Sequence, residues 1–284
     1  MIGTVVLLPF ALGVAGAVVR HLTAHRATAL AAALVVASAL VLFVVLEGLP
    51  GFPPTRALHR FPYAFALVGA LVAAVSLRRT APPAWGAGVA TALASGLAVW
   101  WIGSTILSNN AVKAVAVGLA ILIASLAAAH AVARHRAAPV RATTDGALQT
   151  ALAVSLAAAY LSIDGGYIGM TLFNGALATF TGGHLLVAYV RFLRGDDAAF
   201  APPAPIALAH LWAALSGLLA VLVLAPAPSV AAAVLASLSF AALAVASSAS
   251  FSGLSRALRP IAKGGVLGLP ALASMALLFL FPGA

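Results

Sequence analysis

Long apolar runs are the feature that most constrains what this chain can fold into. Uncharged stretches of roughly 20 residues recur along its length, and an α-helix of that length crosses a hydrocarbon core about 30 Å thick. Of the 284 residues, 64% are hydrophobic and 7% are charged, whereas soluble domains carry about 25% charged residues. The sequence therefore predicts an all-α integral membrane protein in contact with the lipid bilayer, with residues 1–284 forming a single transmembrane domain.

Charged residues, prolines and glycines divide these runs into ten predicted transmembrane helices. Eight or nine helices remain alternatives, if one run re-enters the membrane or two runs merge. The ten predicted spans are residues 2–19, 27–46, 62–77, 84–102, 112–133, 147–163, 167–190, 205–225, 229–249 and 264–281.

The basic residues provide an independent test of this topology, because cytoplasmic loops are enriched in Lys and Arg. Twelve of the fifteen basic residues fall in alternate loops, on one side of a ten-helix arrangement. This distribution predicts a multi-pass protein of the cell inner membrane with both termini outside. The net charge of +10 is therefore explained by topology, and no nucleic-acid partner is expected. The twelve residues are Arg20, Arg26, Arg78, Arg79, Arg134, Arg136, Arg141, Arg191, Arg194, Arg256, Arg259 and Lys263, and those on the other side are Arg56, Arg60 and Lys113.

The chain also divides into two halves of similar length, residues 1–140 and 147–284, each with five predicted spans. Because five is an odd number, equivalent helices of the two halves would cross the membrane in opposite directions. Many secondary transporters are built from such inverted repeats and bind their substrate where the halves meet. An inverted repeat is therefore one interpretation, and chance agreement between evenly spaced loops is the other.

Asp164 is a candidate substrate-binding residue, because it stands beside Gly165 and Gly166 between two apolar runs. Asp-Gly is typical of a tight turn, which would leave Asp164 in solvent at an external corner. Alternatively, the segment unwinds at the membrane face, and Asp164 together with Glu47 holds a cation or an amine, as broken helices do in transporters.

Two further candidates could contact a substrate at or below this outer face. Asn174 is a neutral polar residue inside a predicted span and could bind a neutral or weakly polar molecule. Trp101 lies near the outer end of the fourth span, where tryptophans are common as interfacial anchors. Its alternative role is contact with the substrate.

Three histidines are candidate ligands of haem or of a transition metal: His184, His210 and His130. His184 and His210 are expected at similar depths on adjacent antiparallel helices, and imidazoles on facing helices can ligate such groups. Gly182 and Gly183 could leave room for a flat cofactor. The alternative is that each histidine is hydrogen-bonded within the helix packing, and nothing in the sequence requires a cofactor.

Several motifs are missing from the sequence. It contains no P-loop, no G-x-S-x-G, no H-E-x-x-H and no cysteine, and its five acidic residues are scattered, so the enzyme classes that depend on these motifs are disfavoured. The favoured function is a transporter or permease for a small neutral or weakly polar molecule or a cation. The alternatives are a non-catalytic subunit of a larger membrane complex, which would anchor haem or quinone or act as a scaffold, and a lipid-modifying enzyme. A homo-oligomer and a partner membrane subunit both remain open.

Overall fold

The computed structural model describes residues 3–22, 28–76, 83–137, 146–197, 199–248, 251 and 253–282. These residues form a short π-helical turn, Gly3–Leu7, and ten α-helices, with no strand among them. The helices are α1 (Leu8–Leu22), α2 (Thr28–Glu47), α3 (Ala57–Ser76), α4 (Ala84–Ser108), α5 (Ala111–Ala137), α6 (Ala147–Asp164), α7 (Ile168–Leu193), α8 (Ala204–Leu224), α9 (Val230–Ser248) and α10 (Leu258–Leu280).

Six of these helices, α4 to α8 and α10, are long and apolar enough to cross a membrane by their length and composition. Shorter apolar segments lie in α1, α2 and α9. Large apolar side chains such as Leu93, Leu97 and Leu126 are more than half exposed on the outside of α4 and α5, which is the distribution expected of a lipid-facing surface. The chain is therefore a membrane protein. That all ten helices span the bilayer stays a prediction.

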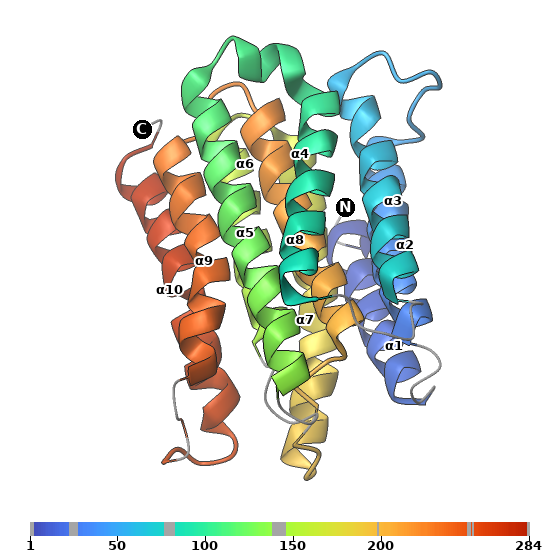
Figure 1. Ribbon diagram of the computed structural model, residues 1–284, viewed down its shortest axis with the longest axis vertical. Helices are drawn as coiled ribbons and strands as arrows, with labels where there is room; N and C mark the ends of the chain where they lie inside the picture. The colour runs from blue at the N-terminus through green and yellow to red at the C-terminus, as the bar shows by residue number, and fades with distance from the viewer. Residues whose placement is uncertain are drawn as a thin grey trace.

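Helix α8 lies inside the bundle, with the other helices around it (Figure 1). It packs against α2, α3, α4, α5, α6 and α7. A helix that is apolar on all sides is normally buried, and nearly all residues of α8 are buried. Alanine and glycine occupy many of its positions, as in AHLWAALSGLLA (209–220), and small residues let neighbouring helices approach closely in lipid.

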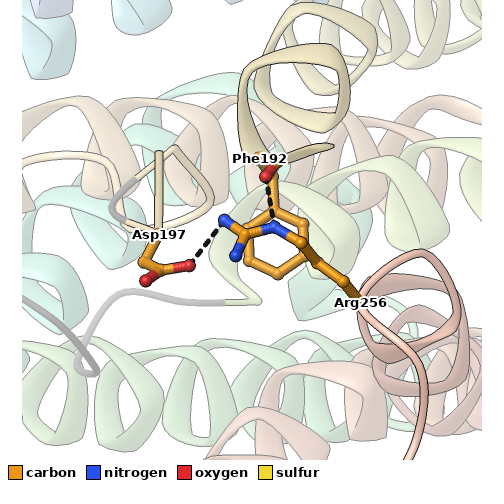
Figure 2. Close-up of polar contacts among 3 residues, drawn as sticks. All are labelled: Phe192, Asp197 and Arg256. Carbon is orange, nitrogen blue, oxygen red and sulfur yellow. Dashed lines mark hydrogen bonds and ion pairs between the residues drawn. The ribbon is translucent and has the colours of Figure 1, made fainter. Parts of the chain in front are cut away.

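Successive helices run in alternate directions, so the basic loops after α7 and α9 meet at one end of the bundle (Figure 1). There Arg256 donates hydrogen bonds to the Phe192 carbonyl oxygen over 2.6 Å and to Asp197 Oδ1 over 2.7 Å. Its guanidinium also lies over the Phe192 ring, 4.5 Å from the ring centroid (Figure 2). The predicted grouping of these loops at one end is thus confirmed for α7 and α9. Which compartment this end faces, and where the termini lie relative to the membrane, stay predictions.

The two halves that the sequence suggests are packed alike only in part. Their last two helices pair closely in both, α4 with α5 and α9 with α10. However, α6 packs on α7, α8, α9 and α10, whereas α1, its equivalent in the first half, packs mainly on α7. The inverted repeat therefore also stays a prediction.

Helix α4 departs from helical geometry at one residue. Gly103 has φ −137° and ψ 24°, which breaks the regular backbone of α4 near its C-terminal end. A Cβ atom at this position would collide with the Val223 side chain of α8. The missing side chain therefore allows the bent part of α4 to lie directly against α8.

Candidate functional site

A crevice lies between α3, α4 and α8, and we call it the central crevice. It is small, because the space that a water-sized molecule can occupy is about 20 Å³, enough for about one water molecule. Its walls are mostly apolar, and none of the lining side chains is ionisable. The lining residues are Phe61, Ala64 and Phe65 of α3, Ser95, Ala98, Val99 and Ile102 of α4, and Trp212, Ser216, Leu219, Ala220 and Val223 of α8.

Two of the lining residues carry buried polar atoms. Ser95 is 2% exposed and Trp212 is 6% exposed. Neither Ser95 Oγ nor Trp212 Nε1 has a hydrogen-bond partner within the described part of the chain. Most buried polar side-chain atoms in proteins do have a partner, either protein or ordered water, so a bound water or a small ligand could complete the hydrogen bonding of these two atoms.

Ser95 shares this state with Thr150, Ser239 and Ser274, whose buried hydroxyls also have no partner among the described residues, whereas other helix hydroxyls are bonded. Thr91, one turn earlier on α4, donates to the Ala87 carbonyl oxygen over 2.8 Å. Ser125 and Ser162 likewise donate to carbonyl oxygens four residues earlier, both over 2.6 Å. Such bonds are the usual way for a hydroxyl to be satisfied within a helix, and Ser95 does not use it.

A cluster of aromatic rings fixes the position of Trp212. Its ring lies 4.6 Å from the ring of Phe65, which in turn contacts Phe61 at 5.8 Å and Phe173 at 6.4 Å between centroids. Phe43 joins the cluster from α2, 5.8 Å from Phe173. Tilted and edge-on ring pairs of this kind stabilise packing beyond the area that they bury. Trp212 is therefore held by α3, and through Phe173 by α7, rather than left to rotate into lipid.

Asn174, a predicted substrate-binding residue, is fully buried on α7. Its Nδ2 donates to the Met170 carbonyl oxygen over 2.9 Å, and its Oδ1 has no hydrogen-bond donor among the described residues. Oδ1 lies against Gly217 of α8, where a Cβ atom would collide with it. Asn174 does not line the central crevice, so the structure places it inside the α7–α8 contact.

The predicted turn between α6 and α7 is confirmed. Gly166 has a positive φ of 73°, and the Tyr167 N–H donates to the Ser162 carbonyl oxygen over 2.8 Å. Asp164 is the last residue of α6 and is half-buried rather than fully solvated.

Glu47, the second carboxylate of the predicted outer site, reaches the beginning of α7. Its carboxylate occupies the space that a side chain at Gly169 would fill. Burial, together with the Glu47 charge, raises the pKa of the Tyr167 phenol to about 12. An acidic group is stabilised near a helix N-terminus by the backbone dipoles, which accounts for this position without a ligand.

Trp101 lies on the surface of α4, outside the central crevice. Its side chain is 43% exposed, and its carbonyl oxygen accepts a hydrogen bond from Arg60 Nη1 over 3.0 Å. The side chain does not line the central crevice. This position suits the interfacial anchor that the sequence indicates for Trp101, rather than its alternative role in contact with the substrate.

The structure brings His184 and His210 together, both almost fully buried. Their ring centroids are 5.0 Å apart with the rings nearly perpendicular, His210 Nδ1 is 3.2 Å from the Thr181 hydroxyl, and the His210 ring stacks on Phe180. Two imidazoles on opposite faces of one haem iron, with Fe–N bonds of about 2 Å, would need centroids about 6 Å apart. The observed rings are too close for that arrangement.

His130 and Gly183 do not extend this histidine pair into a cofactor site. His130 lies on α5, and the described residues contain no group of three His, Cys, Asp or Glu side chains suited to a metal ion. A Cβ atom at Gly183 would collide with the Phe10 carbonyl oxygen of α1. Helix α1 therefore fills the space predicted for a flat cofactor beside Gly183, and that interpretation of Gly183 is wrong. No described atom lies within 4 Å of a Cβ atom placed at Gly182, so the space predicted beside Gly182 stays a prediction.

The sequence interpretation missed two of the residues that matter most in the structure. Trp212 lies in the middle of a predicted span, away from the interfaces where tryptophans are common, and this unusual depth was a usable signal. Lys113 was expected to be a loop charge, but it is only 8% exposed, and its Nζ donates to the Ala225 carbonyl oxygen of the α8 C-cap over 2.8 Å. Its position in the first turn of α5 gave no indication of that partner.

Comparison of the chain with models of known protein families, with functionally characterised proteins and with solved structures found no match to any of them. The central crevice and its two buried hydrogen-bond donors are thus the features from which a function can be argued.

Proposed function

We propose that this protein is a permease of the cell inner membrane that binds a small neutral or weakly polar molecule in the central crevice. The observation that supports it is that two residues lining this mostly apolar crevice, Ser95 and Trp212, carry buried polar atoms that have no hydrogen-bond partner among the described residues. Ligand sites are typically concave and apolar, with a few polar groups that orient the ligand.

The chemistry of the crevice favours an uncharged ligand over a cation. Its polar side chains are Ser95, Ser216 and Trp212, and none of these carries a charge. An ion that enters a membrane bundle without an opposite charge loses its hydration with little in return. Asp164 and Glu47 are the acidic residues of the cation alternative, but neither lines the crevice, and the Glu47 carboxylate lies at the beginning of α7.

The position of the crevice supports movement of the ligand rather than storage. Helices α3 and α4 belong to the first predicted half of the chain, and α8 belongs to the second. Secondary transporters hold their substrates where two halves meet, because relative motion of the halves opens the site to either side. The irregular backbone at Gly103, where α4 lies against Val223 of α8, provides a place at which α4 could bend.

A flux measurement tests this proposal. The purified protein is reconstituted into lipid vesicles, and uptake of urea, acetamide and glycerol is followed by stopped-flow light scattering against protein-free vesicles. We expect at least one solute to enter faster with the protein present. Ala98→Phe, which fills the crevice, should abolish the difference, and Ser216→Val should reduce it.

The matched control is Leu97→Phe, because Leu97 is the neighbour of Ala98 and is 70% exposed on the outside of α4. It adds the same ring to the same helix but leaves the crevice open, so its flux should equal that of the unchanged protein. Equal flux in vesicles with and without protein, for all three solutes, would contradict the proposal. So would full activity of a correctly folded Ala98→Phe variant.

The alternative of a haem-binding subunit has less support. The ring separation of His184 and His210 is too short for axial ligands on opposite faces of a haem iron, and α1 fills the space beside Gly183. A native mass measurement on protein extracted gently from its own membrane separates the two functions. A mass equal to one or more copies of the 28.2 kDa chain supports a carrier that acts alone, whereas a bound foreign subunit or chromophore supports the alternative.

A further inference from the structure

A stripe of exposed apolar side chains on α10 ends beside an exposed arginine. Leu258, Ile261, Leu269 and Leu272 are each more than half exposed, and their spacing places them on one face of the helix. In a membrane protein such a face is expected to contact the lipid acyl chains. Arg259 is exposed next to the first of these residues, and a basic side chain at this place extends from the hydrocarbon toward the lipid headgroups.

Helix α7 ends in the same way. Leu186, Val190 and Leu193 are exposed, and they recur at intervals of four and three residues along one face of the helix. Arg194, the C-cap of α7, follows directly and is exposed as well. Two helices thus each carry an arginine where a lipid-facing stripe reaches its end.

Arg256 connects these two helix ends. It donates hydrogen bonds to the Phe192 carbonyl oxygen over 2.6 Å and to Asp197 Oδ1 over 2.7 Å, and its guanidinium lies over the Phe192 ring (Figure 2). Phe192 comes two residues before Arg194, and Arg256 comes three residues before Arg259. The contact therefore holds both exposed arginines at the same end of the bundle.

Residues 191–197 and 256–263, which we call the basic surface, carry a net positive charge. They contain five basic and two acidic side chains. Both acidic side chains are already paired with arginines of the same surface, over 2.9 and 2.7 Å. The net charge of this surface is therefore +3, and Arg194 has no ion pair within the described part of the chain.

We propose that the basic surface binds the headgroup of an anionic phospholipid, with Arg194 and Arg259 in contact with the phosphate. This inference goes beyond the proposed function and does not depend on the central crevice. The planar guanidinium group matches the oxygens of a phosphate in pairs, and each basic residue close to an anionic membrane surface strengthens binding about fivefold.

Charge and apolar contact together determine the kind of ligand. Phosphatidylcholine carries its own cation, which the net positive charge of the basic surface repels, so an anionic headgroup is favoured. A free phosphate compound has no acyl chains to lie along Leu258 and Ile261, so a lipid is favoured over a soluble anion.

Native mass spectrometry of the purified protein in detergent tests this proposal. The protein is titrated with phosphatidylglycerol and with phosphatidylcholine of the same acyl chains, and the dissociation constant of the first bound lipid is compared. We expect phosphatidylglycerol to bind more tightly. Arg194→Gln and Arg259→Gln should each weaken its binding about fivefold and leave phosphatidylcholine binding unchanged.

The matched control is Arg56→Gln, because Arg56 is an exposed arginine in the loop between α2 and α3, at the other end of the bundle (Figure 1). It removes the same charge and should leave both affinities unchanged. Equal binding of the two lipids by the unchanged protein would overturn the proposal. So would a loss of phosphatidylglycerol binding in Arg56→Gln as large as in Arg194→Gln and Arg259→Gln.

Two measurements on the unchanged protein do not depend on the folding of any variant. Raising the ammonium acetate concentration should weaken phosphatidylglycerol binding, because salt screens exposed charges, and an affinity that does not change with salt would contradict a charged contact. Glycerol 3-phosphate, which has the phosphate without the acyl chains, should not displace the lipid at matched ionic strength. Displacement would show that a soluble anion, rather than a phospholipid, is the ligand of the basic surface.

Discussion

Replacing Lys113 tests how a buried charge stabilises the end of the central helix. Lys113 is in the first turn of α5, and its Nζ donates to the carbonyl oxygens of Ala225, over 2.8 Å, and of Pro226, over 3.4 Å. Carbonyl groups at the end of a helix have no partner within it, and Ala225 is the C-cap of α8. The lysine therefore connects α5 to the C-terminal end of α8.

The expected magnitude follows from opposing contributions. A hydrogen bond to a charged group stabilises by about 1.5–3 kcal/mol, and a cation at a helix C-terminus adds about 0.3–1 kcal/mol. Burial removes the ammonium group from water, and this desolvation cost offsets part of the stabilisation. Lys113→Met retains most of the hydrocarbon chain but leaves the Ala225 oxygen without its donor, so we expect a loss of about 1–3 kcal/mol in the free energy of unfolding.

The assay is unfolding by SDS titration in mixed micelles, followed by loss of helical circular dichroism. Arg194→Met is the control, since Arg194 is an exposed basic residue at the other end of the bundle. The start of α5 itself should be unaffected, because Asn110 Oδ1 accepts a hydrogen bond from the backbone N–H of residue 113 rather than from its side chain. A Lys113→Met variant as stable as Arg194→Met would refute the role assigned to the ammonium group.

Three further predictions concern other contacts. Gly183→Val should destabilise the protein by about 1–3 kcal/mol, because the new side chain must displace α1 at Phe10, and SDS titration would measure the loss. Arg256→Gln should cost only about 0.5–1 kcal/mol by the same assay, because the residue is partly exposed. Glu47→Gln should lower the pKa of Tyr167 from about 12 but not fully to its ordinary value, since burial is the larger cause. Ultraviolet titration of the phenol would show this, and the stability linked to Tyr167 should fall as the pH rises from about 10 toward that pKa.

The helices themselves could be predicted from the sequence because a hydrocarbon environment imposes one requirement on every span. Backbone groups in lipid must be bonded within the segment, so each apolar run of sufficient length becomes a helix whatever its neighbours are. The run at 205–225 accordingly matches α8 at Ala204–Leu224. The central position of α8 could not be predicted in the same way, because nearly every span is apolar and rich in alanine, and such composition does not specify which helix is surrounded by the others.

The candidate site was predicted only in part, for a related reason. Charged residues stand out in an oily chain, so the sequence drew attention to Asp164 and Glu47, which lie at helix ends. Neutral polar residues are common in spans and usually bond to their own helix, as Thr91 does. Whether a particular serine or tryptophan is satisfied depends on what faces it across the bundle, which is a property of packing and not of the residue type.

For the central crevice, the informative quantity is therefore the hydrogen-bonding state of a residue rather than its polarity. Ser95 and Trp212 belong to different halves of the chain and line the same crevice only because α4 lies against α8, which the absence of a side chain at Gly103 permits. If helix packing alone had determined these positions, an apolar residue at Ser95 and a phenylalanine in place of Trp212 would fill the same space without leaving buried donors unsatisfied. The cost of leaving these donors without an acceptor is accounted for if a bound water or a small ligand supplies one, and the flux through the Ala98→Phe variant tests whether a ligand enters the crevice.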